Sequence, residues 1–262
     1  MGHSLPFSLP WGHGTIIYFA EQPADRFIVF VHGFGGSATK TWKGMEALLS
    51  HPGAQSADVA FYGYGSLAAP ARNSATLFRA FLTAAAEQSP PWTSARFRGG
   101  AVGDRDYRDI LIVAHSLGAI VTRRALLDSM KLNLDWVSKT RILLFGPAHM
   151  GTRLVKLTTM LRSGIGSFFS DLFVFGRVKV PVLDDLEEGS DFLKELLAES
   201  HAAVAGGVDR PIRAEGVIFG ERDQVVLTKP FCTDPLSDVW PGEDHCSVCR
   251  VPQTIHEVVR HL

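Results

Sequence analysis

The chain is poor in cysteine, and this limits the kinds of site it could build. Three cysteines in 262 residues, at positions 232, 246 and 249, are too few for a disulfide framework, so we expect a reducing compartment. Cys246 and Cys249 form a single C-x-x-C pair. A zinc site of this type needs further ligands, so the pair favours buried or idle thiols over metal or redox chemistry.

Net charge and long apolar runs are also lacking. The formal net charge is −1, so no overall field recruits nucleic acid or an anionic membrane. No stretch approaches the length of uncharged apolar sequence that crosses a bilayer. Residues 1–15 carry no basic or apolar region of a secretory signal, and Pro6 stands where myristoylation requires Ser or Thr. We therefore predict a cytoplasmic protein without a transmembrane segment or nucleic-acid partner.

The sequence does contain a regular alternation of apolar runs and helical patterns. Its composition, 46% hydrophobic and 20% charged, suits one globular domain over residues 1–262. Runs typical of strands cover 15–20, 27–31, 58–64, 110–113, 141–145 and 216–220, and helical spacing covers 41–50, 74–87, the residues after 117, and 252–261. The alternation predicts an α/β protein with a mostly parallel sheet and right-handed crossovers.

The most informative segment is 109–127. Its apolar run 110–113 predicts a strand buried on both faces, and helical spacing begins at Leu117. Between them lies AHSLG, a G-x-S-x-G nucleophile elbow with alanine in place of the first glycine. So sharp a turn strains the serine backbone and requires small residues two positions before and after it. We predict Ser116 as a nucleophile.

A serine nucleophile needs a base to take its proton and a carboxylate to orient that base. With an elbow of this kind, the acid and then the histidine follow the serine along the chain. Asp223 lies just beyond a predicted strand, where open α/β sheets build their sites, and Glu221 is its main alternative. His245 lies in a loop before the last helix, whereas His256 and His261 fall on that helix. We predict Asp223 as the acid and His245 as the base.

Acyl transfer also needs donors for the developing oxyanion, and backbone amides supply them. One such amide belongs to the residue after the nucleophile, Leu117, and the other to the loop after an early strand. The glycine-rich stretch His32-Gly33-Phe34 is that loop. We therefore predict an oxyanion hole made by the amides of Phe34 and Leu117.

Together these motifs resemble the lipase-like serine esterases of the α/β-hydrolase superfamily, whose relatives include glycosylphosphatidylinositol inositol-deacylase-type proteins. The matching stretches are VHGFGG with Thr41-Trp42, AHSLG, 145–152, 220–226, and Asp244-His245 with Cys249-Arg250. The resemblance implies the α/β-hydrolase fold, with helices on both faces of the sheet and a helical cap inserted after the post-elbow strand. It assigns Ser116, Asp223 and His245 to the triad, and Phe34 and Leu117 to the oxyanion hole.

Two segments interrupt the alternation. Residues 89–107 are rich in Pro, Gly and Arg and predict a surface loop. Residues 153–207 have helical patterns but no strand pattern, and we interpret them as a cap or lid over the carboxyl edge of the sheet. Phe169 and Phe173 fall on one side of a predicted helix, where they either line an acyl pocket or pack on the core. We predict them as substrate-binding residues.

The sequence thus predicts a serine hydrolase, without a cofactor or metal, that cleaves carboxylic esters of small molecules or lipids. Peripheral contact with a lipid surface fits such substrates. A thioesterase, amidase or acyltransferase would use the same residues, so these alternatives stay open. A binding module on a hydrolase scaffold is a further alternative, and the intact set of predicted catalytic residues argues against it.

Overall fold

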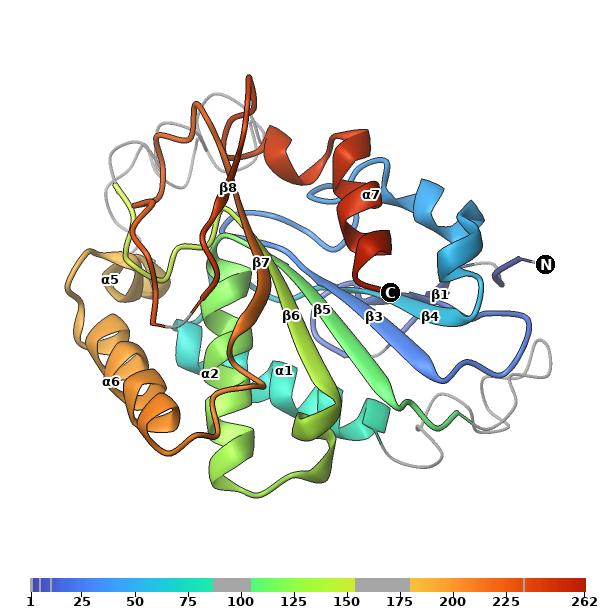
Figure 1. The fold of residues 1–262 in the computed structure, drawn as a ribbon, viewed down its shortest axis with the longest axis horizontal. Coiled ribbons are helices and arrows are strands. Elements are labelled where there is room, and N and C mark those ends of the chain that lie inside the picture. The colour runs from blue at the N-terminus through green and yellow to red at the C-terminus, as the bar shows by residue number, and fades with distance from the viewer. Residues whose placement is uncertain (1, 5, 10, 87–104, 154–179, 233) are drawn as a thin grey trace.

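An eight-stranded sheet forms the centre of the computed structural model, which describes residues 2–4, 6–9, 11–86, 105–153, 180–232 and 234–262 (Figure 1). The strand order is β1-β2-β4-β3-β5-β6-β7-β8. The strands are β1 Phe7–Ser8, β2 Ile16–Tyr18, β3 Arg26–Val31, β4 Ala57–Tyr62, β5 Asp109–His115, β6 Thr140–Phe145, β7 Ala214–Gly220 and β8 Asp238–Trp240. From β4 to β8 every neighbouring pair is parallel, whereas β1–β2 and β2–β4 are antiparallel. The predicted, mostly parallel sheet is confirmed.

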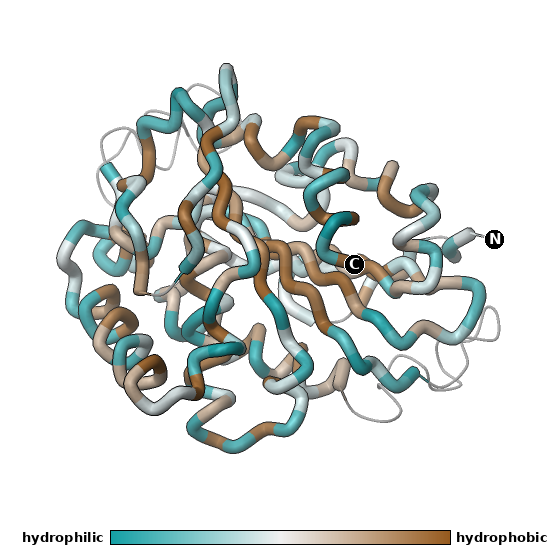
Figure 2. Tube along the Cα trace, in the orientation of Figure 1, coloured by the Kyte–Doolittle hydropathy of each residue, from teal (hydrophilic) through white to brown (hydrophobic). Residues whose placement is uncertain are grey.

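Helices cover both faces of this sheet. They are α1 Ala71–Ala86, α2 Leu117–Lys131, α5 Pro181–Leu186, α6 Asp191–Ala205 and α7 Pro252–Arg260, with 3-10 helices η1 Met45–Ser50, η2 Pro52–Ala54, η5 Asp135–Lys139 and η6 Ser247–Cys249. Along β3, Val29 and Val31 pack on the face of α1 and α2, whereas Ile28 and Phe30 pack on the face of η1 and α7. Because both faces are buried, the central strands are continuously apolar, as Figure 2 shows. None of the described helices is long and apolar enough to span a membrane.

The ends of several elements differ from the sequence prediction because contacts between distant segments set them. Helix α1 begins earlier than expected, at Ala71, whose amide donates to a carboxylate oxygen of Asp185 at 2.7 Å. The helix expected over 41–50 is a 3-10 helix that begins only at Met45. Gly44 precedes it with φ 92°, a left-handed conformation that an α-helix cannot pass through.

The described half of segment 153–207 belongs to the body of the fold. Helix α6 packs against α2 and buries Phe192, Leu193 and Leu196 in the core beneath the sheet (Figure 1). Phe169 and Phe173 lie outside the described residues, so the predicted lid and its acyl contacts stay predictions.

The end of the expected surface loop is buried around an ion pair. Arg105 and Tyr107 are each 2% exposed. Arg105 Nε donates to the buried Asp58 carboxylate at 2.8 Å, and the Tyr107 hydroxyl donates to the same carboxylate oxygen at 2.6 Å. The amide of Ala20 donates to the other oxygen at 2.8 Å. This part of the loop is buried because the carboxylate of β4 needs these donors in the absence of water.

Arg105→Met is expected to lower the free energy of unfolding by about 3 to 5 kcal/mol, because it leaves the Asp58 charge buried without its cation. Urea denaturation measures this loss. Lys229→Met breaks an exposed ion pair with Glu188 and serves as the control, with an expected cost below about 1 kcal/mol. Equal stability of the two variants would contradict a stabilising role for the buried pair.

Candidate active site

Ser116 occupies a strained turn between β5 and α2. Its φ of 55° and ψ of −120° lie in a backbone region that residues other than glycine rarely adopt. Its amide donates to the Phe145 carbonyl of β6 at 3.0 Å. A Cβ at Gly118 would lie 2.5 Å from the Val31 carbonyl oxygen, so the helix can start this close to β3 only with glycine there. The turn has the geometry of the predicted nucleophile elbow.

Hydrogen bonds connect Ser116 to His245 and His245 to Asp223. The distance from Ser116 Oγ to His245 Nε2 is 3.0 Å, and the distance from His245 Nδ1 to Asp223 Oδ2 is 2.7 Å. Asp223 follows β7, and His245 lies between β8 and η6. With Nδ1–H donated to the carboxylate, the lone pair of Nε2 faces the serine hydroxyl. This arrangement allows the imidazole to accept the serine proton.

The environment of Asp223 keeps its carboxylate ionised. Burial by itself raises its pKa, but the hydrogen bond and charge of His245 and the amides of Val225 and Val226 outweigh burial, and the pKa falls below its ordinary value. The two amides donate to Oδ1 at 2.9 and 3.2 Å. The alternative acid, Glu221, is exposed and accepts from the Gly242 amide instead. The structure therefore brings Asp223, and not Glu221, to the histidine.

His115, which no sequence motif singled out as functional, binds the other side of the histidine loop. Its Nε2–H donates to the backbone carbonyl of His245 at 2.7 Å. Burial and, secondly, the charge of His245 lower the pKa of His115 to about 3, so its ring is neutral. Because Nε2 carries the proton, Nδ1 is an acceptor, and it has no partner among the described residues. The one sequence signal for this contact is that His115 directly precedes Ser116 in the AHSLG motif.

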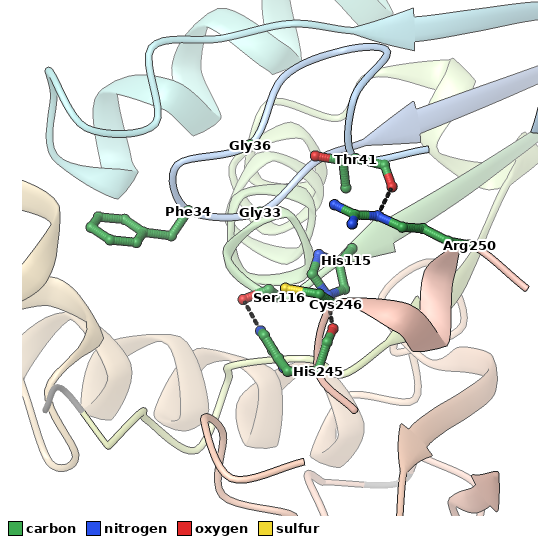
Figure 3. A pocket seen from close by; sticks show the side chains of 9 residues that line it. All are labelled: Gly33, Phe34, Gly36, Thr41, His115, Ser116, His245, Cys246 and Arg250. Atoms are coloured by element: carbon green, nitrogen blue, oxygen red, sulfur yellow. Dashed lines mark hydrogen bonds between the residues drawn. The ribbon is translucent and has the colours of Figure 1, made fainter. Parts of the chain in front are cut away.

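The loop after β3 lies directly against the nucleophile. A Cβ at Gly33 would lie 2.7 Å from the Cβ of Ser116, so only glycine allows this approach. Figure 3 shows the Phe34 ring pointing away from Ser116 while its backbone runs past it. Within the described part of the chain, the amides of Phe34 and Leu117 donate no hydrogen bond. Both are therefore available to an incoming oxyanion.

Comparisons with known proteins agree on the architecture. No family model matches the sequence, and no curated protein matches it. Among solved structures, the mature lipase BlEst2 of Bacillus licheniformis superposes with a TM-score of 0.56 at 17% identity, covering 92% of this chain and 94% of that one. The peroxisomal α/β-hydrolase Lpx1 of Saccharomyces cerevisiae gives 0.55 at 14% identity, with 99% and 88% covered. The chain has the α/β-hydrolase fold.

Naproxen esterase (carboxylesterase NP) of Bacillus subtilis is similar in the same way, with a TM-score of 0.54 at 13% identity and 100% and 91% of the two chains covered. These likenesses confirm the predicted fold class. In the α/β-hydrolase fold the carboxyl ends of the parallel strands meet at one edge, and here Val31 pairs with Ala114 and His115 with Phe145. That register explains why residues from the ends of β3, β5 and β7 meet around one serine.

None of the three cysteines, all in the described part of the chain, forms a disulfide. Cys249 is buried, and its Sγ donates to the carbonyls of Cys246 at 3.3 Å and Thr41 at 3.6 Å. Burial raises the pKa of the Cys249 thiol to about 12, so it stays protonated. Across the residues that the structure describes, no group of three or more His, Cys, Asp or Glu side chains could hold a metal ion.

Proposed function

We propose that the protein is a serine hydrolase that cleaves carboxylic esters through an acyl-enzyme. The observation that carries this proposal is the hydrogen-bonded series Ser116, His245 and Asp223 on a strained elbow. The likeness to a lipase and a carboxylesterase supports it at the level of fold. Within the proposal, the ester belongs to a small molecule or a lipid.

The proposed reaction has two halves. Ser116 Oγ attacks the ester carbonyl while His245 Nε2 takes its proton, and the charge of Asp223 stabilises the imidazolium. The amides of Phe34 and Leu117 bind the oxyanion. As the C–O bond breaks, His245 returns the proton to the leaving alcohol, and the acyl group stays on Ser116. A water then attacks the acyl-enzyme by the same path and releases the acid and the free serine.

In this proposal the acyl group extends toward segment 153–207. Phe169 and Phe173 of that segment are proposed to contact the acyl chain, which is consistent with the apolar pattern of the sequence there. A thioester or amide could enter the same reaction, since the same nucleophile and oxyanion donors serve any acyl transfer.

A fluorophosphonate probe tests the proposal directly. The wild-type protein should be labelled in a 1:1 ratio on the peptide that contains Ser116, because an activated serine attacks phosphorus as it attacks a carbonyl. p-Nitrophenyl esters of graded acyl length should give a burst of nitrophenol when deacylation limits turnover. A protein that is folded but neither labelled nor able to hydrolyse any of these esters would be a binding module, contrary to the proposal.

A further inference from the structure

A small pocket opens beside Ser116, on the side of the loop after η6. It measures about 20 Å³, enough space to hold a water. Figure 3 shows its lining: Gly33, Phe34, Gly36, Thr41, His115, Ser116, His245, Cys246 and Arg250. The nucleophile and an arginine therefore line one small space.

The guanidinium of Arg250 is held in this pocket by its inner nitrogen. Arg250 Nε donates to the carbonyl oxygen of Thr41 at 3.0 Å, and the side chain extends across the opening toward His115 (Figure 3). Its two terminal nitrogens donate to no partner among the described residues. One hydrogen bond thus fixes the direction of the cation and leaves its outer donors open.

No carboxylate of the described chain neutralises this cation. Among the described residues, the only hydrogen-bond or ion-pair partner of its guanidinium is the Thr41 carbonyl. Asp244, the nearest acid in sequence, already accepts from the amides of Cys246 and Ser247, both at 2.8 Å. Since the residue is exposed, an anion can reach it from solvent. Its planar donors suit carboxylate and phosphate oxygens.

The inner wall of the pocket gives a second, independent sign of a ligand. His115 is 6% exposed, and its Nδ1 is a buried acceptor without a partner in the described residues. A buried acceptor of this kind needs a proton donor. One water in the pocket would donate one proton to His115 and the other to an anion held at the opening by Arg250. The two open groups together fit a hydrated anionic oxygen.

We propose that Arg250 is a specificity-determining residue that binds an anionic group of the substrate beside the ester bond. This rests on the proposed function and narrows it to esters that carry a carboxylate or phosphate near the scissile bond.

Two matched pairs of esters test the inference. In the first, p-nitrophenyl hydrogen glutarate is compared with p-nitrophenyl pentanoate, which places a carboxylate on the acyl side. In the second, 1-butyrylglycerol 3-phosphate is compared with 1-butyrylglycerol, which places a phosphate on the alcohol side. The readout is the ratio of kcat/KM for the anionic ester over the neutral one. The pair with the higher ratio identifies where the anion belongs.

Arg250→Gln should lower this ratio roughly 10- to 100-fold in at least one pair, because it removes charge-assisted hydrogen bonds. Arg250→Lys keeps the charge and should retain more of the ratio. Added salt should reduce the ratio of the wild-type protein, since the cation is exposed. Arg260→Gln removes an exposed charge of α7 that pairs with Glu257 and should leave the ratio unchanged.

The inference is overturned if Arg250→Gln leaves both ratios unchanged, or lowers hydrolysis of both members of each pair alike. The second result would show that Arg250 only supports the loop through Thr41. Either result leaves the proposed function intact, as long as the wild-type protein is labelled by the fluorophosphonate. If the wild-type protein is neither labelled nor active on any of the four esters, the proposed function itself is wrong.

Discussion

Ser116→Ala is expected to lower kcat for ester hydrolysis on the order of 10⁶-fold, and His245→Ala to a similar extent. The two side chains act as a unit, because the hydroxyl is a weak nucleophile until the imidazole 3.0 Å away takes its proton. The small remaining rate reflects substrate binding and the oxyanion donors, which both variants keep.

Steady-state kinetics on a p-nitrophenyl ester measure this effect, with circular dichroism to verify the fold. Ser129→Ala is the matched control, since Ser129 is a buried serine of α2 whose hydroxyl donates to the Ala125 carbonyl. It should keep a kcat near that of the wild type. Residual activity in Ser116→Ala within about tenfold of the wild type would show that another residue is the nucleophile.

Asp223→Ala is expected to lower kcat on the order of 10⁴-fold, less than the loss of the nucleophile or base. The carboxylate 2.7 Å from Nδ1 selects the tautomer in which Nε2 can accept a proton, and it stabilises the imidazolium that forms. Without it the ring can turn or hold its proton on the wrong nitrogen.

Glu221→Ala is the control for this prediction, because Glu221 lies on the same loop but its carboxylate accepts from the Gly242 amide. It should retain nearly full activity. If Glu221→Ala were severe and Asp223→Ala mild, the proposed acid would be wrong.

Patterns local in sequence predicted most of the fold. The change from an apolar run to helical spacing around AHSLG placed β5, the turn and α2, because each of these elements is determined by neighbours in the chain. Strand β8 was missed for the opposite reason. Asp238 and Val239 of this strand are exposed, so it lies at the sheet edge without an apolar run, and only its pairing with β7 defines it.

The sequence predicted those site residues whose role follows from their order along the chain. It did not predict those whose role depends on contacts between distant segments. Ser116 and Asp223 followed from chain order and their places after strand patterns, and His245 from chain order and its loop before the last helix. The sequence still left Glu221 as an alternative to Asp223. His115 and Arg250 were not selected, because their partners lie 130 and 209 positions away in the chain. Such pairs form only when the strand ends meet at the sheet edge.

Two adjacent residues at the end of β5 contact the same distant residue, His245. His115 binds the backbone carbonyl of His245, and Ser116 binds its ring. The alignment of nucleophile and base is therefore not the sum of two independently placed loops. The serine and the backbone of His245 are both held at the end of β5, while Asp223 after β7 holds the other ring nitrogen of His245. A shift at the end of β5 would therefore move the nucleophile and the base together, and their spacing would be preserved better than their position relative to Asp223.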